Sequence, residues 1–285
     1  MKKALTCAAL LLATSTFAAE PVFDMHVHLR DYETSLLKYE SEVKESGLQL
    51  SSIGVMWFGG EHQALAGNPA GIRSGNDRLL ALAAKHPEIV PIATVHPYDG
   101  QAALDELTRV SARGIKVLKI HPHTQRFAIS DPRVLATVTK AGELGMAVLI
   151  DNAGIVPNDC QDLFNLALNA PKTPFIFAHM GAANFRFWNI LALARTADGF
   201  ALNNINFDIS GTVLLAADSP IEAEFVWTMR NVGIDHVMLG SDYPQISLKR
   251  MVDALYKLDL TAEERTGILS GNARRVLGGN AVAKN

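Results

Sequence analysis

The 285-residue sequence has few cysteines, no apolar run of membrane-spanning length and no excess of positive charge. Its two cysteines, Cys7 and Cys160, lie far apart. No apolar run approaches the roughly 20 residues that a transmembrane helix needs, and the formal net charge at pH 7 is −3. Nucleic acid, whose phosphates attract basic surfaces, is therefore not expected as a partner. We expect a protein that depends on its core for stability and has neither nucleic acid nor a membrane as a partner.

The first nineteen residues have the pattern of a secretory signal peptide. Two lysines precede an apolar run over residues 4–13, and small residues follow it. We predict cleavage after Ala18 or Ala19 and export across the inner membrane to the periplasm. Cleavage would change the net charge from −3 to −5, because the segment holds two lysines and no acidic residue. It would also leave Cys160 as the only cysteine, so no internal disulfide could form.

The rest of the chain, residues 20–285, alternates between apolar runs and segments of helical pattern. Most of the apolar runs are continuous, as in strands that are covered on both faces. The candidate strands are residues 22–27, 48–58, 89–95, 115–120, 146–150, 174–178, 205–209 and 236–240. Eight such strand and helix pairs predict a single-domain α/β fold, a (β/α)₈ TIM barrel. A doubly wound open sheet is the alternative, because counting these units does not show that the sheet closes.

Proline and glycine mark the ends of several expected helices. Three of these helices lie within residues 76–85, 131–145 and 219–233. Residues 59–75 contain several glycines and predict a long loop after the second strand. In a barrel such a loop lies over the active face, so it could form a lid or a substrate wall. A plain surface loop is the alternative.

Two histidines at the end of the first candidate strand are the strongest sign of chemistry. Side chains alternate along a strand, so His26 and His28 point to the same side and can bind one metal ion. The sixth and eighth candidate strands end at His179 and Asp242, and a closed barrel would bring both side chains to the same mouth. Taken singly, His179 could be a hydrogen-bonded core histidine and Asp242 a helix or turn cap.

These segments resemble the amidohydrolase superfamily, in particular the amidohydrolase-related branch that includes metal-dependent decarboxylases and lactone hydrolases. The resemblance covers nearly all of the chain after the predicted signal peptide. The matching segments are residues 24–28 (DMHVH), 76–78 (NDR), 86–87 (HP), 95–97 (VHP), 115–122 (IKVLKIHP), 177–181 (FAHMG), 206–211 (NFDISG), 240–244 (GSDYP) and 268–277 (ILSGNARRVL). It implies a distorted (β/α)₈ barrel that holds one divalent metal ion, with Zn²⁺ preferred and Mn²⁺ as the alternative.

The resemblance also implies roles for individual residues. His26 and His28 would bind the metal, and Asp242 would bind it and accept a proton. His179 would bind metal or orient the attacking water. A divalent cation lowers the pKa of bound water towards ~7 and polarises a substrate carbonyl. The chain departs from this branch at Asp151, where a metal-binding histidine is usual. Asp151 could bind through oxygen, which favours ions that accept mixed ligands such as Mn²⁺ or Zn²⁺, or it could mean a weakened or lost site.

Three more side chains are candidates for substrate binding. Lys119 and His121 share a face of the fourth candidate strand near the mouth. We favour substrate contact for this pair over the carbamylated, metal-bridging lysine of binuclear superfamily members; the alternative is a lysine that extends to solvent and a histidine that caps a turn. Arg30 follows His28 by two residues, as in dihydroorotases, where the arginine holds a substrate carboxylate. A planar guanidinium suits that task, and a surface arginine is the alternative.

Three functions are compatible with these observations. The first is hydrolysis of a carboxylic ester, lactone or amide bond by a metal-activated water, on a small substrate that carries a carboxylate if Arg30 binds one. The second is non-oxidative decarboxylation of an aromatic or related carboxylic acid. The third is an exported barrel that has lost catalysis through Asp151 and acts as a binding protein. The sequence is compatible with a homo-oligomer.

Overall fold

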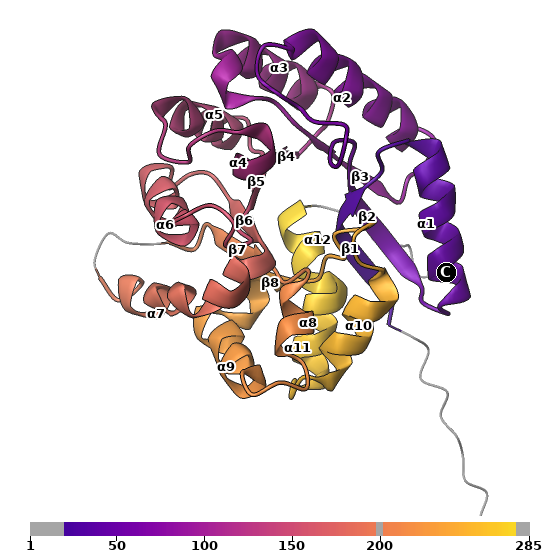
Figure 1. Cartoon of the computed structure of the whole chain (residues 1–285), viewed down its shortest axis with the longest axis vertical. Coiled ribbons are helices and arrows are strands. Elements are labelled where there is room, and N and C mark those ends of the chain that lie inside the picture. The colour runs from indigo at the N-terminus through magenta and orange to yellow at the C-terminus, as the bar shows by residue number, and fades with distance from the viewer. Residues whose placement is uncertain (1–19, 198–201, 278–285) are drawn as a thin grey trace, which may run out of the picture.

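The computed structural model of the chain describes residues 20–197 and 202–277 (Figure 1). The predicted signal peptide, residues 1–19, lies outside the described residues, so its cleavage and the export of the protein remain predictions. Within the described residues, no helix is both long and apolar enough to cross a membrane.

Eight parallel strands form one sheet whose spatial order follows the sequence. The strands are β1 Val22–His28, β2 Leu50–Met56, β3 Ile89–Ala93, β4 Val117–Ile120, β5 Ala147–Asp151, β6 Phe175–Ala178, β7 Ile205–Asp208 and β8 Val237–Met238. Backbone hydrogen bonds join the last strand region to the first: Met25 N donates to Leu239 O at 3.2 Å, and His28 N donates to Tyr243 O at 2.8 Å. The predicted (β/α)₈ barrel is confirmed, and the open sheet is excluded.

Helices surround the strands (Figure 1). The α-helices are α1 Glu33–Glu45, α2 Pro69–Ala83, α3 Gln101–Ala112, α4 Pro122–Gln125, α5 Pro132–Glu143, α6 Asp159–Asn169, α7 Ile190–Ala194, α8 Thr212–Ala216, α9 Glu222–Val232, α10 Leu248–Lys257, α11 Ala262–Thr266 and α12 Asn272–Leu277. Short helical turns of other pitch are η1 Pro97–Asp99, η2 His179–Asn189, η3 Ile234–His236 and η4 Gly267–Gly271.

The strands are buried on both faces, which explains their continuous apolar runs. Every residue of β1 and of β4 to β8 is buried. Aromatic rings fill the space around β6 and β7, where Phe177 stacks on Trp188 with ring centroids 4.9 Å apart and meets Phe207 edge to face. Burial of each such ring contributes about 2–3 kcal/mol of transfer free energy. This packing gives the strand ends a rigid base.

The long loop predicted over residues 59–75 is shorter than expected. Helix α2 begins at Pro69, so the connection after β2 covers residues 57–68. Asn68 caps the helix, because its side chain accepts a hydrogen bond from Gly71 N, and proline suits the first helical position because it has no N–H to leave unpaired. The glycines of the segment led to the wrong boundary.

Candidate functional site

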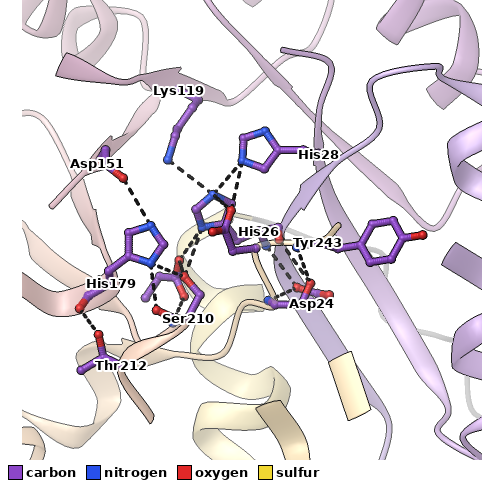
Figure 2. Close-up of polar contacts among 12 residues, drawn as sticks. Asp24, His26, His28, Lys119, Asp151, His179, Ser210, Thr212 and Tyr243 are labelled. Atoms are coloured by element: carbon purple, nitrogen blue, oxygen red, sulfur yellow. Dashed lines mark hydrogen bonds and ion pairs between the residues drawn. The ribbon is translucent and has the colours of Figure 1, made fainter. Parts of the chain in front are cut away.

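A cavity of about 180 Å³ lies at the carboxyl ends of the strands. All eight side chains that the sequence predicted for a site line its wall. They come from the ends of β1, β4, β5 and β6 and from the segment after β8. Figure 2 shows several of them converging from different strands. Closure of the barrel therefore gathers residues that are more than 200 positions apart in the chain.

Three donor atoms converge at one side of this cavity. His26 Nε2 and His28 Nε2 lie 3.2 Å apart, and Asp242 Oδ1 lies 3.5 and 3.3 Å from them, respectively. Two ligand atoms that share a cation at about 2.0–2.2 Å must lie within roughly 4.4 Å of each other. All three separations meet this condition, and all three residues are buried. The donor set of two imidazoles and one carboxylate suits a divalent cation such as Zn²⁺ or Mn²⁺.

The hydrogen bonds of the two imidazoles set their tautomers. His26 Nδ1 lies 2.7 Å from Asp208 Oδ2, and His28 Nδ1 lies 2.5 Å from the backbone oxygen of Phe58. Because both partners only accept, each Nδ1 carries the proton and donates it. The two Nε2 lone pairs then face each other, which is repulsive unless a cation or a donated hydrogen lies against them. The tautomers therefore leave both Nε2 atoms able to bind a cation at the three donors.

Asp242 is held as a carboxylate. Its Oδ2 accepts a hydrogen bond from Gln245 Nε2 at 3.0 Å, which directs Oδ1 towards the histidines. Burial opposes ionisation, but the neighbouring imidazoles of His26 and His28 outweigh it and lower the pKa of Asp242 to about 2. Its backbone has a φ of 59°, a left-handed conformation that is uncommon for a residue other than glycine. Such strain is typical of functional positions.

A second cluster lies beside these donors. Asp151 Oδ1 lies 3.3 Å from His179 Nε2 and 3.5 Å from His121 Nε2. Burial opposes the charged imidazole, but the hydrogen bond to Asp151 raises the pKa of His179 to about 9. His179 Nδ1 donates to the backbone oxygen of Ser210 at 2.8 Å. The structure thus brings together three of the four predicted metal ligands and places Asp151 between two histidines, outside the three-donor group.

The backbone that carries His179 is strained. His179 has a φ of 62°, and the three residues that follow it also have positive φ values. Thr212, at the start of α8, donates its hydroxyl hydrogen to the backbone oxygen of His179 at 2.5 Å (Figure 2). Gly181 N donates to Asn152 O at 2.9 Å. These contacts hold the imidazole at the mouth of the cavity against the conformational preference of the chain.

Arg30 lines the cavity next to a glycine pair. Its guanidinium lies against Gly59 and Gly60, and any side chain at Gly60 would overlap it. Arg30 Nε is buried, yet it has no hydrogen-bond partner among the described residues. A buried N–H without a partner costs about 1–3 kcal/mol, so this position holds the guanidinium at a cost in stability. The interpretation of Arg30 as a plain surface arginine does not fit this position.

Lys119 and His121 both reach the cavity. Lys119 is 1 % exposed, so the lysine that extends to solvent is excluded. Its Nζ lies 3.5 Å from His26 Nε2. His121 lines the cavity and also caps α4, because its Nδ1 accepts a hydrogen bond from Thr124 N at 3.5 Å. Burial is the main cause that lowers the pKa of His121, to about 4, so this ring is neutral at pH 7.

Sequence reasoning missed the residues that orient the site from behind. Asp208 accepts hydrogen bonds from His26 Nδ1 and, at 2.8 Å, from the hydroxyl of Ser210. The Ser210 hydroxyl oxygen also lies 3.0 Å from His179 Nδ1, so it links the two clusters. Asp208 ends a buried strand as Asp151 does, and that signal could have identified it.

The fold and the donor set define a class: a (β/α)₈ barrel with a candidate site for a divalent metal ion at the carboxyl ends of its strands. The chain belongs to the amidohydrolase family, because the family described as "Amidohydrolase" matches residues 23–279. The predicted family is therefore confirmed. No curated protein sequence matches the chain.

Several solved structures have the same fold. A proposed amidohydrolase from Staphylococcus aureus superposes with a TM-score of 0.69 at 18% identity, over 92% of this chain and 100% of that one. A 5-carboxyvanillate decarboxylase from Novosphingobium aromaticivorans, complexed with manganese and 4-hydroxy-3-methoxy-5-nitrobenzoic acid, gives 0.65 at 18% identity, over 84% and 79%. A protein from Pseudomonas putida proposed to be a 2-pyrone-4,6-dicarboxylic acid hydrolase gives 0.62 at 16% identity, over 93% and 100%. At these identities the likeness concerns the fold.

Proposed function

We propose that the protein is a metal-dependent hydrolase that cleaves a carboxylic ester, lactone or amide bond in a small substrate. The observation that carries this proposal is the convergence of His26 Nε2, His28 Nε2 and Asp242 Oδ1 on one side of the cavity. A divalent cation bound by these atoms, Zn²⁺ or Mn²⁺, would polarise a substrate carbonyl and a water molecule. The manganese in the decarboxylase complex supports a metal site in this fold.

Asp242 and His179 have charges that suit complementary roles. With a pKa of about 2, Asp242 is a carboxylate at pH 7 and can accept a proton from the attacking water. His179 is cationic, with a pKa of about 9, and Asp151 and Ser210 fix its ring. A fixed positive charge at the mouth stabilises negative charge that develops on a substrate oxygen. In this proposal Asp242 is the base and His179 positions the water or the substrate.

The cavity wall indicates a small substrate with a carboxylate. Its volume of about 180 Å³ is below the roughly 300–1,000 Å³ of sites for drug-sized ligands. Arg30 contributes its guanidinium to the wall, and Lys119 and His121 add two polar groups. Phe58 and Ile155 supply apolar wall for a ring or a short chain. The acids named for the decarboxylase complex and the pyrone hydrolase support this substrate class.

Non-oxidative decarboxylation is the second candidate. It is favoured by the fold of the decarboxylase that is complexed with manganese and a benzoic acid. In that reaction the same cationic groups would hold a substrate acid, and no water would attack. Release of carbon dioxide from a panel of aromatic acids would identify it, whereas ring opening of a lactone or cleavage of an ester or amide would identify hydrolysis.

The proposal is tested with metal-free protein that is reloaded with Zn²⁺ or Mn²⁺. We expect about one ion per chain and a hydrolytic activity that appears only after reloading. Replacing both histidines, His26→Ala with His28→Ala, should abolish metal binding and turnover, as measured by elemental analysis and by product formation. His62→Ala is the control, because this histidine is partly exposed and does not line the cavity.

Two results would contradict the proposal. Full activity in the double variant would mean that the reaction does not use this site. A wild-type protein that binds no metal, and that binds small acids without converting them, would favour the inactive binding protein.

A further inference from the structure

Lys119 is a buried amine directed at the three-donor group. It lies in β4 and is 1 % exposed, and Figure 2 shows its side chain extending towards His26. The nearest group that pairs with its Nζ is His26 Nε2, at 3.5 Å. Within residues 20–197 and 202–277, no carboxylate forms an ion pair with Lys119 inside 4.0 Å. Asp151, Asp242 and Asp208 act on it only at longer range.

The contact occupies an atom that the metal also needs. His26 Nδ1 donates its hydrogen to Asp208, so Nε2 has one lone pair and no hydrogen. A lone pair can accept an N–H from the lysine or bind a cation, and one lone pair cannot do both. This conflict exists whether the lysine is an ammonium or a neutral amine, since both carry N–H donors.

Charge repulsion adds to this competition for the lone pair. An ammonium and a divalent cation on neighbouring atoms repel each other strongly in a buried site. In the metal-free protein the same ammonium would offset part of the negative charge of the nearby carboxylates, which are costly to bury alone. The charge of Lys119 therefore stabilises the metal-free site and opposes the binding of a metal ion.

We propose that Lys119 is an internal competitor of the metal: its amino group holds His26 Nε2 in the metal-free protein and must be displaced when a divalent ion binds. Once displaced, the amino group remains in the cavity, where it can reach a substrate carboxylate. The inference rests on the proposed metal site and adds a determinant of its affinity. Metal binding and the release of a substrate-binding amine are thereby coupled.

The test measures metal affinity and does not depend on turnover. Dissociation constants for Zn²⁺ and for Mn²⁺ are measured by competition with a chromophoric chelator, at fixed pH and ionic strength, for wild type, Lys119→Met and Lys119→Leu. We expect both variants to bind metal more tightly, by about tenfold or more, which is the scale on which groups next to metal ligands act. Lys116→Met is the matched control, because Lys116 is an exposed lysine just before the same strand, and its affinity should equal that of wild type.

Melting curves of the metal-free proteins check that each variant folds, and two different replacements protect the test against one that does not. Unchanged affinity in the folded Lys119 variants would overturn the competition. Weaker binding would overturn it as well and would make the lysine a group that helps to hold the metal. If none of the four proteins binds either ion, the proposed metal site fails, and this inference fails with it.

Discussion

Asp208 is the residue that determines how His26 presents its lone pair. Its Oδ1 accepts the backbone N–H of Ser210 at 2.7 Å, and its Oδ2 accepts both His26 Nδ1–H and the Ser210 hydroxyl. All three of these neighbours donate, so a carboxylate satisfies each of them. An imidazole fixed in this way keeps its other nitrogen free for a cation.

The first prediction at this scale concerns Asp208→Asn. The side-chain oxygen of the asparagine should remain with the backbone N–H of Ser210, and its NH₂ group should then face His26. His26 Nδ1 becomes an acceptor, the proton moves to Nε2, and that nitrogen can no longer bind a cation. We expect the affinity for Zn²⁺ and Mn²⁺ to fall by about 10–100-fold, as measured by chelator competition.

Asp235→Asn is the control, because this aspartate lies near the surface with a side chain 67% exposed and should leave the affinity unchanged. Equal affinities in the Asp208 variant and wild type would show that the tautomer of His26 is not set by this carboxylate.

Single residues could be predicted where a local sequence pattern marks them. His26, His28 and Asp242 were identified because each follows an apolar run and the two histidines have the spacing of a metal pair. The backbone oxygen that orients His28 carries no signal in the sequence. Asp151 also follows an apolar strand, but position at a strand end does not say which neighbour across the mouth the side chain will meet.

At the scale of elements, a bulge in β1 sets the direction of His26, the first proposed metal ligand. Asp24 pairs with Ile53 and Val27 with Val55, so two residues of β1 stand opposite Gly54 alone. A bulge of this kind bends a strand locally and changes the direction of its side chains. The backbone oxygen of Met25 approaches this glycine so closely that an added Cβ would lie 2.6 Å from it. The bulge therefore requires glycine on the neighbouring strand.

The prediction that follows is the cost of Gly54→Ala. The new methyl group would meet backbone atoms, which cannot rotate away, so the strands must separate or the bulge must change. We expect the free energy of unfolding to fall by about 1–3 kcal/mol, as measured by urea denaturation with an unchanged slope. Gly271→Ala is the control, because its nearest atom would be 3.9 Å away. A Gly54 variant as stable as wild type would mean that the strand pair can open without cost.

The type of each element was predicted better than its first and last residues. All eight strands lie where apolar runs indicated, yet β8 covers only Val237–Met238 of the expected residues 236–240. The start of α2 was misplaced because Gly71 and Gly75 suggest a loop. Gly75 in fact lets the helix pack against Trp57, since any Cβ there would overlap the indole. Such contacts between distant segments cannot be read from local pattern.

At the scale of the whole molecule, a buried carboxylate ties the last strand region to the first. Asp24 Oδ1 accepts the backbone N–H of Ser241 at 2.8 Å, and its Oδ2 accepts the hydroxyl of Tyr39 at 2.8 Å. Asp242 is the next residue after Ser241, and its own N–H donates to the backbone oxygen of His26 at 2.8 Å. The same set of contacts therefore closes the barrel and places Asp242, the third proposed metal ligand.

The prediction at this scale is that Asp24→Ala weakens the fold and the site together. The substitution leaves the N–H of Ser241 and the hydroxyl of Tyr39 buried without their acceptor, and each such loss costs about 1–3 kcal/mol. Urea denaturation should show this loss of stability, and chelator competition should show weaker metal binding, because the segment before Asp242 is no longer fixed. Asp105→Ala, on the exposed face of α3, should change neither quantity.

Stability and metal affinity, measured on the same variant, decide whether barrel closure also positions the metal site. If stability falls and metal affinity does not, Asp242 is positioned by its own bond to the backbone of His26 and by Gln245 alone. If both fall, the contact that closes the barrel also builds the site, and the fold and the metal binding of this protein depend on the same buried carboxylate. The second result is the one that the geometry favours, because residues 241 and 242 are adjacent and both donate their N–H groups to β1.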